Sequence, residues 1–196
     1  MEIRSFLAFE LPPDIKRVVS ETSAAIKQLP LDARWVKADH IHLTIVFLGS
    51  VPEGQIQPLG ETVRRVCQTH APFRVALGGL GLFSSGKVPR VLWIGMTGDM
   101  ERMAGFRDEL QEALAPFHVR SEKRRFKAHL TLGRFRKGAR SDPCLVEALH
   151  RFEALTSPIC ELRELVLYRS DLNPEGVRYT RLGAWPLGGK APGGHG

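Results

Sequence analysis

The chain has few cysteines and no long apolar run. Its three cysteines, Cys67, Cys144 and Cys160, are widely spaced, and an odd number at such spacing favours free thiols in a reducing compartment over a disulfide framework. No stretch approaches the ~18 apolar residues of a membrane-spanning helix, and the first residues lack the basic flank, apolar segment and cleavage site of a secretory signal. We therefore expect a cytoplasmic protein without membrane contacts.

Acidic residues are almost missing between Arg120 and Arg140. This segment holds nine of the chain's 28 lysines and arginines and a single acid, Glu122, whereas positive and negative residues nearly balance elsewhere. The net charge of +7 thus arises in one segment, which favours a polyanionic partner there. A solvated basic surface is the alternative. Phe126 and Phe135 interleave with the cations and either stack on bases or belong to the core.

One tetrapeptide occurs twice in the chain. The sequence HLTI at residues 42–45 returns as HLTL at residues 129–132. In a strand, side chains i and i+2 point to the same face, so each copy presents an imidazole beside a hydroxyl. The repeat predicts one active site built from two halves. Two histidines that are simply hydrogen-bonded to backbone on inner strands are the alternative.

The residues around each copy predict which face is buried. The alternation expected of a half-buried strand places four apolar residues on the buried face of the first copy: Ile41, Leu43, Ile45 and Phe47. In the second copy that face consists of Ala128, Leu130 and Leu132, whereas His129, Thr131 and Gly133 share the opposite one.

The chemistry of the repeated residues favours proton transfer. Imidazole donates and accepts protons near neutrality, so His42 and His129 facing one substrate would supply an acid and a base. The hydroxyls of Thr44 and Thr131 suit hydrogen bonds to a phosphoryl oxygen. No cysteine or serine adjoins either copy, and threonine is a weak nucleophile without a dedicated base. In-line attack by water or by a substrate hydroxyl is therefore favoured.

A metal site is the main competing explanation of paired histidines. Zinc needs three or four ligands from histidine, cysteine and carboxylate at typical spacings. Asp39 alone stands near either copy, so we expect neither a metal nor another cofactor.

The remaining pattern is that of one domain of mixed helices and strands. The length of 196 residues fits one domain, which we place at residues 1–187, followed by a disordered tail at 188–196. Besides the two motif strands, the periodicity predicts the following elements. Strands are expected at 3–11, 73–80, 91–96, 161–168 and 177–182, helices at 14–28, 53–70, 100–114 and from Pro143 onward, a loop at 81–89 and a turn at 173–176.

Seven segments carry a family resemblance: FLAFELP (6–12), RWV (34–36), HLTIVFLG (42–49), GGLG (78–81), PRVLWIG (89–95), FKAHLTLGR (126–134) and LVLYRSDL (165–172). In this order they resemble the two-histidine phosphoesterases, and within them the RNA 2′,3′-cyclic phosphodiesterases first described as 2′-5′ RNA ligases (LigT-like). The similarity spans most of the chain, from about residue 4 to residue 187. The resemblance implies an α+β fold with two pseudo-symmetric lobes, each an antiparallel sheet backed by helices, and an active-site cleft between them.

The resemblance also implies an activity and its residues. The activity is metal-independent hydrolysis of RNA 2′,3′-cyclic phosphate ends, on tRNA fragments for example, to 2′-phosphates by a monomer. His42 would be the general acid, His129 the general base, and Thr44, Thr131 and Arg134 would bind substrate. Strict alternation points Arg134 away from His129, so its role requires the strand to end or bulge at Gly133. The reverse reaction, 2′-5′ ligation, and a non-catalytic RNA-binding module are the alternatives.

Overall fold

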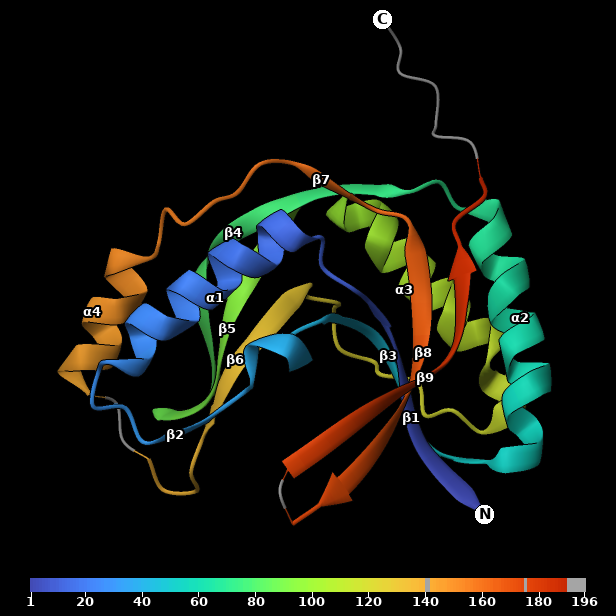
Figure 1. Cartoon of the computed structure of the whole chain (residues 1–196), viewed down its shortest axis with the longest axis horizontal. Coiled ribbons are helices and arrows are strands. Elements are labelled where there is room, and N and C mark those ends of the chain that lie inside the picture. The colour runs from blue at the N-terminus through green and yellow to red at the C-terminus, as the bar shows by residue number, and fades with distance from the viewer. Residues whose placement is uncertain (140–141, 175, 190–196) are drawn as a thin grey trace, which may run out of the picture.

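The computed structural model describes residues 1–139, 142–174 and 176–189. Its strands form two antiparallel sheets, one with the order β3-β1-β8-β9 and the other with the order β2-β6-β5-β4-β7 (Figure 1). The strands are β1 (Glu2–Phe9), β2 (Ala33–Trp35), β3 (Leu43–Pro52), β4 (Phe73–Ser85), β5 (Val88–Gly98), β6 (His129–Phe135), β7 (Cys160–Leu162), β8 (Glu164–Asn173) and β9 (Gly176–Pro186).

Helices connect and cover these sheets. They are α1 (Pro13–Lys27), α2 (Ile56–Thr69), α3 (Met100–Ala113) and α4 (Pro143–Arg151), with single 3₁₀ turns η1 (Ala38–His40), η2 (Glu53–Gln55) and η3 (Ala115–Phe117). As predicted, α4 begins at Pro143, and the Asp142 side chain accepts a 2.7 Å hydrogen bond from the Cys144 amide, which satisfies a free donor of the first turn. In the described part of the chain, no helix has the length and apolar character needed to cross a bilayer.

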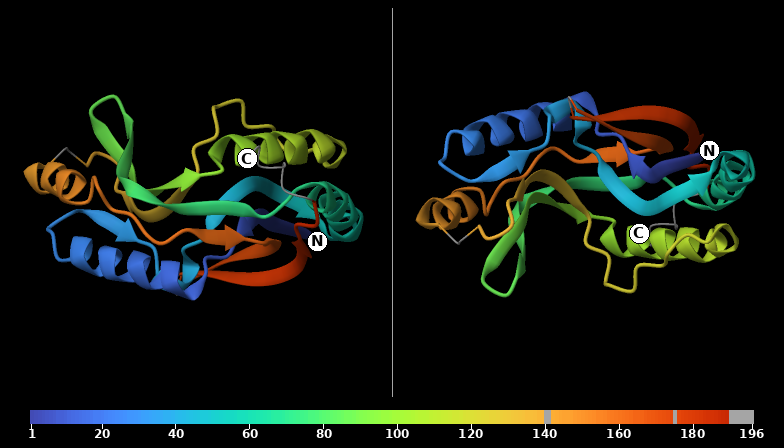
Figure 2. Two further views of the ribbon diagram at one scale, coloured as in Figure 1. Left: turned by 90° about the horizontal axis from the view of Figure 1, so that it is seen from above. Right: turned by 90° about the horizontal axis from the view of Figure 1, so that it is seen from below.

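The helices lie on different sheets. Figures 1 and 2 show α1 over the five-stranded sheet, whereas α2 and α3 lie beside the four-stranded sheet, where α2 contacts β9 and α3 contacts β3. The fold is thus α+β with two lobes, as predicted. One core joins them: the buried rings of Phe9, Phe73 and Phe106 have centroids 5.4–6.1 Å apart and come from β1, β4 and α3.

Two of the predicted elements are wrong. The expected loop at 81–89 is a β-hairpin, in which β4 and β5 pair as far as Ser85 and Val88. Gly81 does not break the strand, because it makes room for the Trp93 ring: a Cβ there would lie 2.1 Å from it. The expected single strand at 161–168 is divided at Arg163 into β7, which belongs to the five-stranded sheet, and β8, which belongs to the other. One apolar run therefore contributes a strand to each of the two sheets.

The end of the described chain is bonded to α2. The amides of Gly188 and Gly189 donate to the carbonyls of Cys67 and His70 at 3.1 and 3.0 Å. The remainder of the expected tail, 190–196, lies outside the described residues. The three cysteines are free thiols, as predicted.

Candidate active site

His42 lies immediately before β3 against a wall of aromatic rings. Its ring stacks on Phe6 of β1, with centroids 4.7 Å apart and an angle of 20° between the planes. Tyr168 of β8 stacks at 6.0 Å, and Tyr179 of β9 meets the imidazole edge-on at 5.3 Å. Three neighbouring strands thus surround His42, and the imidazole is half-buried among them.

The predicted buried face of the first copy is correct except at Phe47. Ile41, Leu43 and Ile45 are buried, but the side chain of Phe47 is 64% exposed. Ala8 and Leu7 of β1 pair with Thr44 and Val46, so Ile45 is an extra residue that bulges. A bulge reverses the alternation beyond it, which turns Phe47 toward Phe6, with centroids 6.2 Å apart.

His129 is the first residue of β6 and is also half-buried among aromatic rings. Ala128, Leu130 and Leu132 are buried, as predicted. The imidazole lies edge-on to Phe83 of β4 at 4.9 Å and to Trp93 of β5 at 6.2 Å. Each imidazole thus stands at the start of its strand beside rings from other strands of the same sheet.

Both imidazoles are held by a carbonyl two residues earlier in the chain. Nδ1 of His129 donates to the Lys127 oxygen at 2.7 Å, and His42 is hydrogen-bonded to the backbone of His40. In the neutral form of His129 the proton is therefore on Nδ1, and Nε2 is an acceptor.

The surroundings favour the neutral form of both imidazoles. Burial lowers the pKa of His42 to about 4, against the opposing effect of the His40 hydrogen bond. Burial also lowers the pKa of His129; the hydrogen bond to Lys127 opposes this, and the charges of Arg134 and Lys127 reinforce it.

The charge of Arg134 acts on titratable groups from both sheets. Leu92 and Trp93 pair with Gly133 and Thr131, so Leu132 bulges, one residue before the position where a bulge was required. The charge of Arg134 lowers the pKa of His129 in one sheet, and it opposes the burial that raises the pKa of Tyr179 in the other. The charge of this guanidinium therefore acts on His129 and on Tyr179, which is a neighbour of His42.

The aromatic neighbours were not found by the sequence reasoning about the site. Phe6, Tyr168 and Tyr179 come from three strands remote in sequence from His42, so no local spacing links them to it.

The structure also forms two surface hollows, one by α3 and residues 121–125 and one between α2 and β9. Neither is lined by a motif residue. In 1–139, 142–174 and 176–189, no three histidine, cysteine or carboxylate side chains are grouped so as to bind a metal ion.

Threonines 44 and 131 occupy equivalent places. Each is half-buried two residues after its histidine. Thr44 pairs with Ala8 of β1, and Thr131 pairs with Trp93 of β5. Each thus lies just before the bulge of its strand.

Comparison with known proteins agrees with this duplicated arrangement. The family described as LigT like Phosphoesterase matches residues 9–93 and again 94–179, with one motif in each match. A protein of Geobacillus stearothermophilus named RNA 2′,3′-cyclic phosphodiesterase is 33% identical over 189 residues, which is 96% of this chain but only 58% of that protein. A protein of the same name from Methanothermobacter thermautotrophicus is 28% identical over 95% of this chain and 100% of its own length.

Solved structures share the fold. One from Thermus thermophilus aligns with a TM-score of 0.77 and 26% identity over 96% of this chain and 100% of its own. Escherichia coli LigT complexed with 3′-AMP aligns with a TM-score of 0.77 and 26% identity over 95% and 99% of the two chains. This chain belongs to the LigT-like phosphoesterase family.

Proposed function

We propose that this protein hydrolyses RNA 2′,3′-cyclic phosphate ends to 2′-phosphomonoesters, with His42 and His129 as acid and base and without a metal ion. The observation that carries the proposal is the duplicated setting of the two imidazoles. Each precedes or begins a strand, is bonded to a carbonyl two residues earlier, and lies two residues before a threonine. The relatives named RNA 2′,3′-cyclic phosphodiesterase support the same reaction.

His129 is suited to the role of base. Its Nδ1 proton is committed to the Lys127 carbonyl, so Nε2 is the nitrogen that accepts a proton from water. Oxygen of that water attacks phosphorus as the bond from phosphorus to the 3′ oxygen breaks. Two neutral imidazoles cannot complete the reaction, because the departing oxygen needs a proton.

His42 would supply that proton. Its pKa of about 4 in the free protein would rise when an anionic phosphodiester lies beside it, because an opposite charge favours the protonated form. After the 3′ oxygen takes the proton, His129 is an imidazolium and His42 is a neutral imidazole. Exchange with solvent restores the starting state.

Thr44, Thr131 and Arg134 would bind the phosphate. The hydroxyls donate to its non-bridging oxygens, and Arg134 offsets charge that grows on them in the transition state. The bulge at Leu132 and the effect of the Arg134 charge on the pKa of His129 support this role.

We further propose that the substrates are RNA fragments in the cytoplasm, tRNA fragments among them. We also propose that the protein acts as a monomer and that its single domain ends at residue 187. The bonds of Gly188 and Gly189 to α2 mean that a truncation after residue 187 should be compared with one after residue 189. Size-exclusion chromatography with light scattering tests the oligomeric state.

Product analysis tests the reaction. An oligonucleotide with a 2′,3′-cyclic phosphate end should yield a 2′-phosphate end, identified by phosphorus NMR and by resistance to a 3′-specific phosphatase. A 3′-phosphate product would mean that the substrate lies reversed, with the acid and base exchanged. Joined products would assign ligation, and RNA that is bound but unaltered would assign a binding module.

A further inference from the structure

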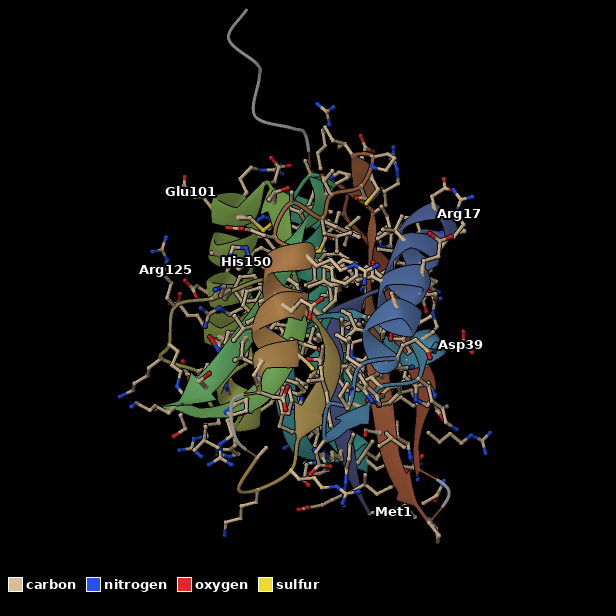
Figure 3. All side chains as sticks on the ribbon, turned by 90° about the vertical axis from the view of Figure 1, so that its left-hand side faces the viewer. Met1, Arg17, Asp39, Glu101, Arg125 and His150 are labelled. Atoms are coloured by element: carbon tan, nitrogen blue, oxygen red, sulfur yellow. The ribbon has the colours of Figure 1, made fainter. Side chains whose placement is uncertain are left out.

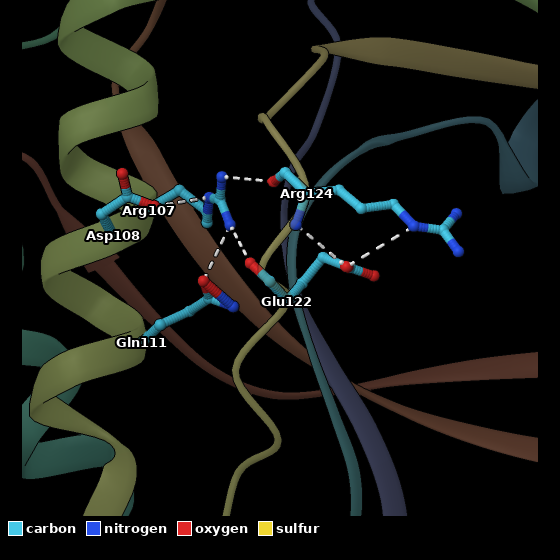
Figure 4. Close-up of polar contacts among 5 residues, drawn as sticks. All are labelled: Arg107, Asp108, Gln111, Glu122 and Arg124. Atoms are coloured by element: carbon cyan, nitrogen blue, oxygen red, sulfur yellow. Dashed lines mark hydrogen bonds and ion pairs between the residues drawn. The ribbon is translucent and has the colours of Figure 1, made fainter.

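A buried arginine on α3 holds the basic loop that leads to His129. Arg107 is buried, although a guanidinium loses much hydration energy when it leaves water. Its partners replace that hydration (Figure 4): one terminal nitrogen donates to Gln111 Oε1 and to the Glu122 carbonyl, both at 2.8 Å, and the other donates to the Arg124 carbonyl at 3.2 Å. Nε lies at an ion-pair distance of 3.0 Å from the Asp108 carboxylate, without a hydrogen bond.

The loop that Arg107 holds has no regular structure of its own. Residues 119–128 connect η3 to β6 outside any helix or strand. Backbone polar groups in such a segment need partners from elsewhere, and here two carbonyls take them from α3. The guanidinium also lies 5.4 Å from the centre of the Phe126 ring. Five contacts in the loop and its helix therefore converge on one side chain.

The other face of this loop presents cations to solvent. Lys123, Arg124, Arg125 and Lys127 are exposed, and the side chain of Arg124 is 91% exposed. Figure 3 shows Arg125 projecting outward beside α3. Lys127 lies over the Trp93 ring, 4.3 Å from its centre, and its carbonyl accepts the bond from His129. The cations thus run directly up to one imidazole.

We propose that Arg107 is a positioning residue, which fixes the 121–127 loop so that its cations contact the phosphates of the RNA strand beside the reacting end. This rests on the proposed function, because RNA is the polyanion involved. A loop free to move would pay an ordering entropy each time RNA binds, whereas a loop already fixed by Arg107 would not. The effect should therefore appear in RNA affinity rather than in the chemistry at His129.

The test compares Arg107→Met with Arg102→Met. Arg102 is a matched control on the same helix: it pairs with Asp99 at 2.6 Å, donates to the Ala71 carbonyl at 3.1 Å and lies 5.1 Å from the Phe73 ring centre. It therefore makes the same kinds of contact but holds the segment before β4, which carries no catalytic candidate.

Two substrates separate positioning from catalysis. We expect Arg107→Met to weaken binding of single-stranded RNA by about tenfold or more at low salt and to reduce the steepness of its salt dependence. The turnover number on a 2′,3′-cyclic mononucleotide, which has no neighbouring phosphates for the loop cations to contact, should stay within about twofold of the unmodified protein. Arg102→Met should change neither. Arg107→Lys keeps the charge but loses the planar guanidinium that donates to two carbonyls at once, so it should weaken RNA binding less than Arg107→Met. It replaces Arg107→Met in the test if that variant does not fold.

The outcomes are distinct. Unchanged RNA affinity in both Arg107 variants would overturn the proposal, as would an equal loss in the Arg102 variant or an equal fall in turnover of the mononucleotide. If the unmodified protein turns over neither substrate, the proposed function fails; the RNA-binding comparison still decides the role of Arg107.

Discussion

The depressed pKa values of the two imidazoles predict an acidic pH optimum for kcat/KM. In the reacting form the acid is an imidazolium and the base is a neutral imidazole, so the pair carries one titratable proton. In the free protein both pKa values lie below the ordinary histidine value of 6.5. The kcat/KM of an acid–base pair follows the free enzyme, so both limbs of its bell-shaped profile should lie below pH 6.5.

The magnitude follows from proton occupancy. Above the higher of the two pKa values, the singly protonated form declines about tenfold for each pH unit. With that pKa below 6.5, kcat/KM at pH 8.5 should be at most about 1% of its maximum. The kcat profile should lie at higher pH, because the bound phosphodiester raises the pKa of an adjacent imidazole.

Initial rates on a 2′,3′-cyclic mononucleotide between pH 4 and pH 9, at constant ionic strength, measure both profiles. The cyclic diester keeps a single negative charge over this range, so its own titration does not contribute. An alkaline limb of kcat/KM centred above pH 7 would refute the reasoning, because it would mean that burial does not govern the imidazoles in the free protein.

Three further predictions concern the histidines, metal independence and RNA binding. His42→Ala and His129→Ala should each lower turnover by at least about 10²-fold with unchanged circular dichroism; near-normal turnover in either variant would contradict the assignment. Activity should survive EDTA, because the described residues form no metal-binding cluster; loss on chelation with recovery on one added metal would contradict this. Neutralising Arg124 and Arg125 together should reduce the log–log salt slope of RNA binding by about 1.4 if each contacts one phosphate; an unchanged slope would show that they only solvate the surface.

A fourth prediction concerns stability. The lowered pKa of His42 means that the unfolded chain binds a proton between pH 6.5 and about 4 and the folded chain does not. The contribution of neutral His42 to the free energy of unfolding is therefore fully present above pH 6.5. It is lost as the pH falls toward 4, which lowers that free energy by up to about 3 kcal/mol. His42→Gln should lack this loss in urea unfolding at pH 4 to 8, and a pH-independent difference from the unmodified protein would exclude it.

Local patterns in the sequence predicted most helices and the motif strands. Alternation identified the buried faces around Leu43 and Leu130, and Pro143 in the first turn identified the start of α4. Both patterns depend only on neighbouring residues. The division of 161–168 between the two sheets could not be predicted this way. Both β7 and β8 are apolar enough to pair, and only distant partners decide which sheet each one joins.

The aromatic surroundings of the imidazoles were hidden for the same reason. Phe6 directly faces Phe47 across β1 and β3, and it faces Tyr168 across β1 and β8. These pairs depend on strand order and register, which sequence spacing does not contain. The basic segment was visible as a charge excess, but nothing in its composition indicated that Arg107, outside the segment, holds its backbone.

The two errors of alternation have one cause. Phe47 and Arg134 are each five residues after the histidine of their motif, and simple alternation placed Phe47 in the core and pointed Arg134 away from His129. Ile45 and Leu132, the equivalent fourth residues of the two tetrapeptides, both bulge. Each bulge reverses the face of the residues beyond it: Phe47 is exposed, and Phe135 packs on the core, which leaves Arg134 on the side of His129. The duplication therefore extends beyond the repeated letters to a repeated backbone irregularity. Beyond the bulges the two halves carry different side chains at equivalent places. Phe47 packs near Phe6 in one half, and in the other the charge of Arg134 lowers the pKa of His129.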